Sequence, residues 1–359
     1  MMYRFKALAL VAALLLPISA SAAEQAVRKL EFVMAHKPEN VENVKLIEKF
    51  ADRVRERTHG ELDISVFAPS AYSPDFQQAL DEVYLGKTAM SQIAIKYFLP
   101  ISQDLDVLDM PMLFKSHEHA AKVLDGRIGQ DLRQSVYDGS NGRVRGLSFT
   151  YSGGFRDVYS TKDIHSVAEL KGQKMRLRGG RFSLDAMDQL GLQYVYTPLY
   201  DDAGWAKMHS TGDIQAEEAE VNRIATYKYR HPEVAKSIKT VLETHHSLYL
   251  TMIVFNGPMF ASLTPDQQNI VQEEAQTLAL QERALSIQQE QDSKAQMAAE
   301  GVKFVSMSPA DRQELEQMGN RVQAKYHHTL GKWIDAIKAA EPLSKVQESK
   351  VEKLSPKPL

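Results

Sequence analysis

The sequence predicts an α/β protein of two units joined by one long helix, and three observations support this fold class. The chain has 359 residues, more than the roughly 100–200 residues of a typical domain, which suggests two domains. Along the chain, segments in which apolar and polar residues alternate, as in strands, are followed by segments with the apolar spacing of helices. After Pro265, neither proline nor glycine occurs before Gly301, which allows a single helix about 54 Å long at roughly 1.5 Å per residue.

The amino terminus has the pattern of a secretory signal peptide. Arg4 and Lys6 precede an apolar core at 7–18, and residues 20–22 form a small-x-small cleavage pattern. The core is shorter than the roughly 20 residues of a membrane-spanning helix. We expect residues 1–22 to be removed from an exported protein, so that the formal net charge changes from −3 to −5 with the loss of the two basic residues.

The composition excludes several function classes. The mildly acidic charge gives no electrostatic reason to expect a nucleic-acid partner. The absence of cysteine excludes thiolate chemistry and cysteine-ligated zinc. Neighbouring histidines such as His245 and His246 point to different sides of a strand, and no His-Glu-x-x-His motif occurs, so no metal site is expected. The chain also lacks a Gly-x-Ser-x-Gly elbow, a P-loop and a dinucleotide fingerprint, so we expect neither catalysis nor a cofactor.

The first unit is predicted to run β-α-β-α-β, from hydrophobic alternation in its strands and apolar spacings of three and four in its helices. The predicted elements are a strand at 29–35, a helix from Val44 to Val54 closed by Gly60, a strand at 61–67, a helix at 76–83 stopped by Gly86, and a strand at 88–95. Next come an irregular apolar segment at 105–114 expected to cross the surface, a helix at 120–136 and a strand at 143–149. Ser152-Gly153-Gly154 then forms a plausible hinge, because glycine absorbs large backbone changes.

The second unit is predicted to begin at Phe155. Its predicted elements are a strand at 174–177, a helix at 183–190, a strand at 192–197, a helix near 201–210, an acidic run at 214–220 and an apolar strand at 248–255 that returns the chain to the first sheet. The long helix then begins with a capping box formed by Thr264 and Gln267, with Pro265 at its first position. A further helix begins near Ser308, and the lysine-, glutamate- and proline-rich residues 341–359 are expected to be disordered.

A cluster of arginines follows the strand at 174–177. Arg176, Arg178 and Arg181 fall within six residues, and Gly179 and Gly180 lie among them. The planar donor fork of arginine matches a carboxylate, and ligands of open α/β sheets bind beyond the carboxyl ends of strands. The cluster therefore indicates either a site for a small organic anion or a solvated strand end.

Several motifs occur in an order and spacing that is typical of one family. They are Gly-Phe-Arg at 154–156, Tyr-Ser-Thr-Lys-Asp-Ile at 159–164, Leu-Lys-Gly at 170–172, Lys-Met-Arg at 174–176, Thr-Gly-Asp-Ile at 211–214 followed by Glu218, Thr-His at 244–245, Asn256 at the end of a strand, and Leu-Thr-Pro-Asp-Gln-Gln at 263–268. With them, the chain resembles the substrate-binding proteins of tripartite ATP-independent periplasmic (TRAP) transporters, the dicarboxylate- and sialate-binding family. The resemblance covers roughly residues 31–326.

The resemblance implies the architecture and the partners. The fold would be α/β, a two-lobed periplasmic-binding-protein clamshell with a long helix spanning both lobes. The first lobe would be 23–153, continued by about 246–282, the second lobe 154–245, and the spine and C-terminal helices 264–340. The mature protein would be a periplasmic monomer that binds a small carboxylate ligand and delivers it to the TRAP permease subunits.

The resemblance also assigns two arginines. Arg176 falls on the arginine that clamps the substrate carboxylate, which agrees with the anion site argued from the residues, and Arg156 falls on a second arginine that often helps. If they do not bind a ligand, Arg176 would form a surface ion pair and Arg156 would form an ion pair at the hinge. Arg178 and Arg181 have no counterpart in the family.

Four further residues are candidates for the ligand site. Glu218 either contacts a ligand hydroxyl or bonds to backbone amides across the cleft. His36 either points into the cleft from the end of the first strand or lies in a surface turn. Tyr200 and Tyr97 either stack on a ligand or pack in the core.

The chain departs from the family pattern near the expected pocket. The family sequence Asp-Gly-x-Glu becomes Gln215-Ala216-Glu217-Glu218, the asparagine of sialate binders becomes Ala219, and Glu-x-Tyr becomes Ala203-Gly204-Trp205. These changes argue against sialate and leave uronates, aldonates, dicarboxylates, 2-oxoacids and aromatic acids open, with a uronate or related sugar acid favoured. A periplasmic sensor subunit and a secreted enzyme acting on acidic sugars remain as alternative functions.

Overall fold

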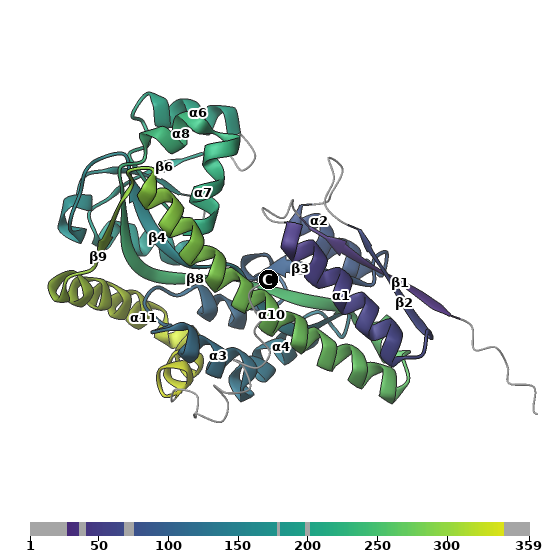
Figure 1. Ribbon diagram of the computed structural model, residues 1–359. Helices are drawn as coiled ribbons and strands as arrows, with labels where there is room; N and C mark the ends of the chain where they lie inside the picture. The colour runs from purple at the N-terminus through teal and green to yellow at the C-terminus, as the bar shows by residue number, and fades with distance from the viewer. Residues whose placement is uncertain (1–26, 36–40, 68–74, 178–179, 198–201, 341–359) are drawn as a thin grey trace, which may run out of the picture.

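The chain folds into two lobes that share one sheet (Figure 1). The computed structural model describes residues 27–35, 41–67, 75–177, 180–197 and 202–340. The expected signal peptide and disordered tail, as well as His36 and Tyr200, lie outside the described residues. The α/β class predicted from the sequence is confirmed.

Nine strands of the described residues form the sheet, in the order β2-β1-β3-β8-β4-β7-β5-β6, with β9 paired to β8. The strands are β1 (Arg28–Met34), β2 (Leu62–Phe67), β3 (Met90–Ala94), β4 (Val144–Ser160), β5 (Lys174–Leu177), β6 (Gln193–Tyr196), β7 (Ala216–Glu220), β8 (Thr240–Asn256) and β9 (Lys303–Ser306). Strands β1 to β3 belong to one lobe, whereas β5 to β7 belong to the other (Figure 1).

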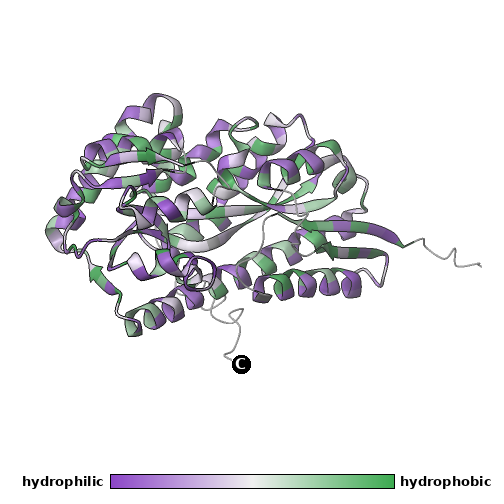
Figure 2. Ribbon diagram, turned by 90° about the horizontal axis from the view of Figure 1, so that it is seen from above, coloured by the Kyte–Doolittle hydropathy of each residue, from purple (hydrophilic) through white to green (hydrophobic). Residues whose placement is uncertain are grey.

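Helices cover both lobes (Figure 1). The helices are α1 (Val41–Arg57), α2 (Phe76–Leu85), η1 (Ile95–Phe98), η2 (Gln103–Asp109), α3 (His117–Asp125), α4 (Arg127–Gly139), η3 (Val167–Leu170), α5 (Arg181–Gln189), α6 (Asp202–Ser210), α7 (Val221–Arg230), α8 (Pro232–Ser237), α9 (Gly257–Ala261), α10 (Pro265–Ala299) and α11 (Pro309–Lys338). Hydrophilic and hydrophobic residues alternate around the helices in Figure 2, as expected for helices with one face on a core. Among the described helices, none combines the length and the apolar character needed to cross a bilayer.

Strands β4 and β8 run through both lobes as an antiparallel pair of 17 residues each. The sequence predicted only part of each strand, 143–149 and 248–255, because Gly153 and Gly154 interrupt the alternation of β4. In the structure the two glycines lie at a shift in register between Tyr151 and Gly154, with φ of 106° and 89°. The predicted return of the chain to the first sheet through β8 is confirmed by the pairing of β3 with β8.

Helix α10 is the spine of the molecule and contacts α1 in one lobe and α7 in the other (Figure 1). It has 35 residues and begins at the predicted capping box, in which the Thr264 side chain accepts from the amide of Gln267 and the Gln267 side chain accepts from the amide of Thr264. The predicted start of the helix is confirmed. A helix in contact with both lobes provides a rigid support along the shared strands.

Two segments differ from the sequence prediction. The apolar segment at 105–114 was expected on the surface, but Leu105, Val107 and Leu108 of η2 are buried in the largest core cluster. The expected helix at 120–136 is interrupted at Gly126, where α3 ends and α4 begins. A β-carbon at Gly126 would lie 2.5 Å from the carbonyl oxygen of Lys122, so this tight connection requires glycine.

Candidate ligand-binding site

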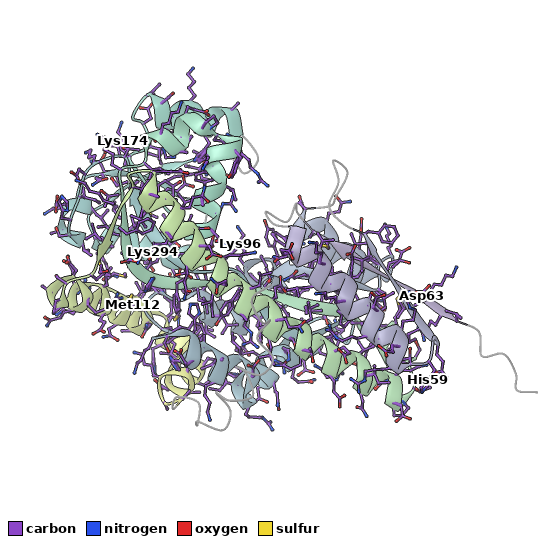
Figure 3. The ribbon with its side chains drawn as sticks, in the orientation of Figure 1. His59, Asp63, Lys96, Met112, Lys174 and Lys294 are labelled. Atoms are coloured by element: carbon purple, nitrogen blue, oxygen red, sulfur yellow. The ribbon has the colours of Figure 1, made fainter. Side chains whose placement is uncertain are left out.

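A cavity lies where the two long strands meet η1, η2, β5 and β7. It is lined by Ile95, Lys96, Leu108, Asp109, Arg156, Arg176, Glu217, Glu218, Ala219, Glu220, Arg223, Leu248, Tyr249 and Leu250. Figure 3 places Lys96 between the two lobes. Acidic and basic side chains therefore line one cavity between the two lobes.

Arg176 is buried at this cavity. It lies in β5, whose register pairs it with Glu217 of β7, and only 3% of its side chain is exposed. Its Nε donates to Oγ1 of Thr197 at 2.6 Å and its Nη1 donates to Oε1 of Glu217 at 2.7 Å. The guanidinium also lies 5.1 Å from the centre of the Trp205 ring. The contacts fix the orientation of the guanidinium.

Glu217 is held by three further donors. Its Oε2 accepts from the hydroxyl of Tyr159 at 2.5 Å, from Nε1 of Trp205 at 2.8 Å and from Nε2 of His209 at 3.2 Å. Because a carboxylate only accepts, Nε2 of His209 carries the proton in this contact. Burial, together with the Glu217 charge, raises the pKa of Tyr159 well above its usual value, so the tyrosine stays a donor.

Arg156 of β4 forms a second positive centre. Its guanidinium contacts three carboxylates, Glu220 at 3.2 Å, Glu218 at 3.6 Å and Asp109 at 3.7 Å, and its side chain is 16% exposed. Burial by itself would lower the pKa of Arg156, but the surrounding carboxylates raise it above its usual value. Arg156 therefore remains charged.

The carboxylates around Arg156 have different pKa values. Burial would raise the pKa of Glu218, but a 2.9 Å hydrogen bond from Nε2 of His246 and the charge of Arg156 lower it to about 2. Burial raises the pKa of Asp109 to about 6, against the opposing effect of Arg156, and the charge of Glu218 adds to the increase. Glu218 is thus ionised at neutral pH, whereas Asp109 titrates close to it.

Comparison with known proteins identifies the family. The model of bacterial extracellular solute-binding protein family 7, DctP, matches residues 32–329. The chain belongs to this family. The resemblance inferred from the motifs is thereby confirmed.

Named relatives of this DctP-family chain bind sugar acids. The chain is 28% identical over 298 residues to the 2,3-diketo-L-gulonate-binding periplasmic protein YiaO of Escherichia coli K12, covering 82% of this chain and 85% of YiaO. It is 22% identical over 264 residues to the sialic acid-binding periplasmic protein SiaP of Vibrio cholerae, covering 73% of this chain and 78% of SiaP.

Solved structures of TRAP periplasmic solute-binding proteins share the fold of this DctP-family chain. One from Citrobacter koseri with bound D-glucuronate has a TM-score of 0.72 at 21% identity, covering 88% of this chain and 100% of that one. One from Ochrobactrum anthropi has a TM-score of 0.78 at 20% identity, covering 92% of this chain and 99% of that one. The predicted two-lobed clamshell is confirmed by these matches.

The sequence-predicted site residues of the DctP-family chain fall into three groups. Arg176, Arg156 and Glu218 all line the cavity. Tyr97 lies in η1 and packs on the ring of Phe76 with 5.4 Å between ring centres, and the cavity is lined by its neighbour Lys96 instead. His36 and Tyr200 lie outside the described residues. The ligand-binding roles of all six residues stay predictions.

The remaining arginine of the predicted cluster, Arg181, has a partner away from the cavity lining. Its Nη2 lies 2.8 Å from Oδ2 of Asp106, and its guanidinium also stacks against Phe182 and Tyr326, while Arg178 lies outside the described residues. Arg181 thus links α5 to η2 and α11.

Three acidic residues of the cavity were missed by the sequence reasoning, namely Asp109, Glu217 and Glu220. The sequence held a signal for Glu217 and Glu220, because acidic residues in a buried strand require positively charged or hydrogen-bonding partners. The register supplies these partners, since it places Glu217 beside Arg176 and Glu220 beside Arg156. No local pattern marks Asp109, which lies at the end of η2.

Proposed function

We propose that this DctP-family protein is a periplasmic solute-binding protein that captures a small hydroxylated organic acid and delivers it to a TRAP permease. The observation that carries the proposal is the presence of two arginines at one cavity, the buried Arg176 and the partly buried Arg156. Each guanidinium has five N–H donors, and the hydrogen bonds of Arg176 to Thr197 and Glu217 use two of them, which leaves donors for a ligand carboxylate. We infer binding rather than turnover.

The other polar groups of the cavity favour a ligand with hydroxyl groups. Glu218 and Glu220 are acceptors, and a sugar hydroxyl is a donor that such acceptors recognise. Relatives support this class, since YiaO is named for 2,3-diketo-L-gulonate and the Citrobacter koseri protein holds D-glucuronate. One carboxylate and a few hydroxyl contacts suffice for micromolar affinity, which corresponds to about −8 kcal/mol.

Capture would involve closure of the two lobes on the ligand. We propose the lobes as 23–153 with 246–282 and 154–245, and the hinge as Ser152-Gly153-Gly154 at the register shift of β4. A ligand that touches both lobes favours the closed state by its additional contacts there. Exclusion of water on closure strengthens the ion pair between Arg176 and the ligand carboxylate.

Isothermal titration calorimetry tests the proposal. The purified protein is titrated with D-glucuronate, D-gluconate, 2,3-diketo-L-gulonate and succinate, after a thermal-shift screen of a wider set of organic acids. We expect micromolar binding of at least one sugar acid and a loss of at least ten-fold in Arg176→Ala, whereas Arg127→Ala, at an exposed site on α4, leaves the affinity unchanged. Absence of binding by every acid, or equal affinity in Arg176→Ala, would refute the proposed function.

A further inference from the structure

Arg176 and Glu217 form a buried ion pair inside the proposed ligand site. The 2.7 Å contact joins side chains that are 3% and 2% exposed. An ion pair that is removed from water interacts more strongly than one at the surface. Arg176, the residue expected to hold the ligand carboxylate, therefore already has a carboxylate partner within the protein.

Glu217 is fixed in place and is not displaced easily by a ligand. Three donors, from Tyr159, Trp205 and His209, converge on its Oε2, while Oε1 receives Arg176. Moving Glu217 away would leave these buried donors without their acceptor, which is costly. A ligand carboxylate must therefore add to the Arg176–Glu217 pair instead of replacing Glu217.

The fixed pair adds no net charge to the cavity. The charge of Glu217 cancels that of Arg176, and three more carboxylates, Glu218, Glu220 and Asp109, contact Arg156. One ligand carboxylate can still accept hydrogen bonds from the guanidinium groups. Lys96 and Arg223 also line the cavity, so its four acidic side chains are balanced by four basic ones. A second carboxylate on the same ligand would be desolvated without a net positive charge to neutralise it, which is unfavourable.

We propose that Glu217 is a specificity-determining residue, a fixed internal counterion of Arg176 through which the cavity selects monocarboxylates over dicarboxylates. The inference rests on the proposed function, because it requires that the cavity binds an organic acid. Glu217 also orients Arg176, so the test must separate its charge from its positioning role.

Matched acids that differ by one carboxylate provide the test. The pairs are D-gluconate with D-glucarate, D-galactonate with galactarate, and butyrate with succinate, and each dissociation constant is measured by calorimetry at pH 7.5. In the wild-type protein we expect each diacid that binds to do so at least ten-fold more weakly than its monoacid. In Glu217→Gln, which keeps the shape of the side chain and removes its charge, we expect this ratio to fall at least ten-fold.

Two variants separate charge from structure. Glu217→Asp keeps the charge and shortens the side chain, so we expect weaker binding overall with the ratio retained. Glu273→Gln removes a negative charge at an exposed site on α10, where Glu273 pairs with Arg57, and we expect it to leave the ratio unchanged. A purely structural role for Glu217 would weaken both members of each acid pair equally in Glu217→Gln.

The outcomes distinguish this inference from the proposed function. Failure of every acid to bind the wild-type protein overturns both. Binding of a diacid as tightly as its monoacid by the wild-type protein overturns the inference alone, and this result does not require that any variant folds. An unchanged ratio in a folded Glu217→Gln protein also overturns it.

Discussion

The guanidinium carbon of Arg156 lies 4.5 Å from the centre of the Tyr249 ring, which links β4 to β8 at the cavity. The same strand holds a second arginine in a similar contact, since Arg145 lies 4.5 Å from the centre of the Phe260 ring. Of these two arginines, only Arg156 lines the cavity. Comparing substitutions of the two arginines therefore distinguishes the effect of ring stacking on the fold from the effect of the Arg156 guanidinium on ligand binding.

We expect Arg156→Lys to weaken binding of a sugar acid by about ten-fold, or about 1.4 kcal/mol, because lysine keeps the charge but lacks the planar fork. Arg145→Lys makes the same chemical change outside the cavity and should leave the affinity unaltered. Isothermal titration calorimetry of both variants measures their affinities for the sugar acid. Equal losses in the two proteins would mean that Arg156 acts only through the fold.

We expect Gly153→Ala to destabilise the protein by about 1–3 kcal/mol, because its φ of 106° is strained for alanine. The new β-carbon would also lie 2.7 Å from Oδ1 of Asn222 and 2.7 Å from the β-carbon of Glu220. Gly212→Ala is the control, since Gly212 has a φ of 76° with nothing within 4 Å, so it measures the backbone strain alone. Urea denaturation should show a larger loss for Gly153→Ala than for Gly212→Ala.

We expect Glu282→Gln to stabilise the protein at pH 8 but not at pH 5. Burial raises the pKa of Glu282 to about 7 in the folded state, although Gln92 donates to its carboxylate. Between about pH 4.5 and pH 7 the folded state therefore holds more protons than the unfolded state, so stability falls as the pH rises through this window. In Glu282→Gln the free energy of unfolding does not fall in this window, so at pH 8 it exceeds that of the wild type by about 2 kcal/mol.

Urea denaturation at pH 5 and pH 8 measures the effect of Glu282→Gln. Glu316→Gln replaces an exposed glutamate of α11 and should show no difference between the two pH values. A stability difference between wild type and Glu282→Gln that stays constant with pH would contradict the assignment of the raised pKa to Glu282.

We expect His246→Leu to lower the free energy of unfolding at pH 7 by about 1–2 kcal/mol, because Glu218 loses a hydrogen bond of 2.9 Å. The pKa of Glu218, now about 2, should rise toward its usual value. The stabilisation from a lowered carboxylate pKa is complete above about pH 4.5 and is lost as the pH falls through about 2, so the wild-type advantage should shrink in acid.

Chemical denaturation of His246→Leu at pH 7 and at pH 3 checks both parts of this expectation. His328→Leu, at an exposed histidine of α11, is the matched control and should have little effect at either pH. If the two histidine variants lose the same stability at pH 7, the contact between His246 and Glu218 makes no net contribution.

Local sequence patterns determined much of the fold. Helix α10 begins where its capping box predicts, because Thr264, Pro265 and Gln267 satisfy the first amides of the helix without help from the rest of the chain. Strand β5 spans the predicted residues, and Arg176 lies near its carboxyl end as expected. Each of these features depends on neighbours in sequence, which is why it can be recognised in the sequence alone.

Only the tertiary structure decided what surrounds the arginines and where the long strands end. Arg176 meets Glu217 across 41 residues of sequence, through the register of β5 with β7, and Arg156 meets Asp109 from η2. The burial of η2 and the continuity of β4 through Gly153 and Gly154 likewise depend on packing against distant segments. Contacts between residues far apart in sequence follow from the pairing of strands, which no short stretch of the chain encodes, so the charge balance of the cavity emerged only with the fold.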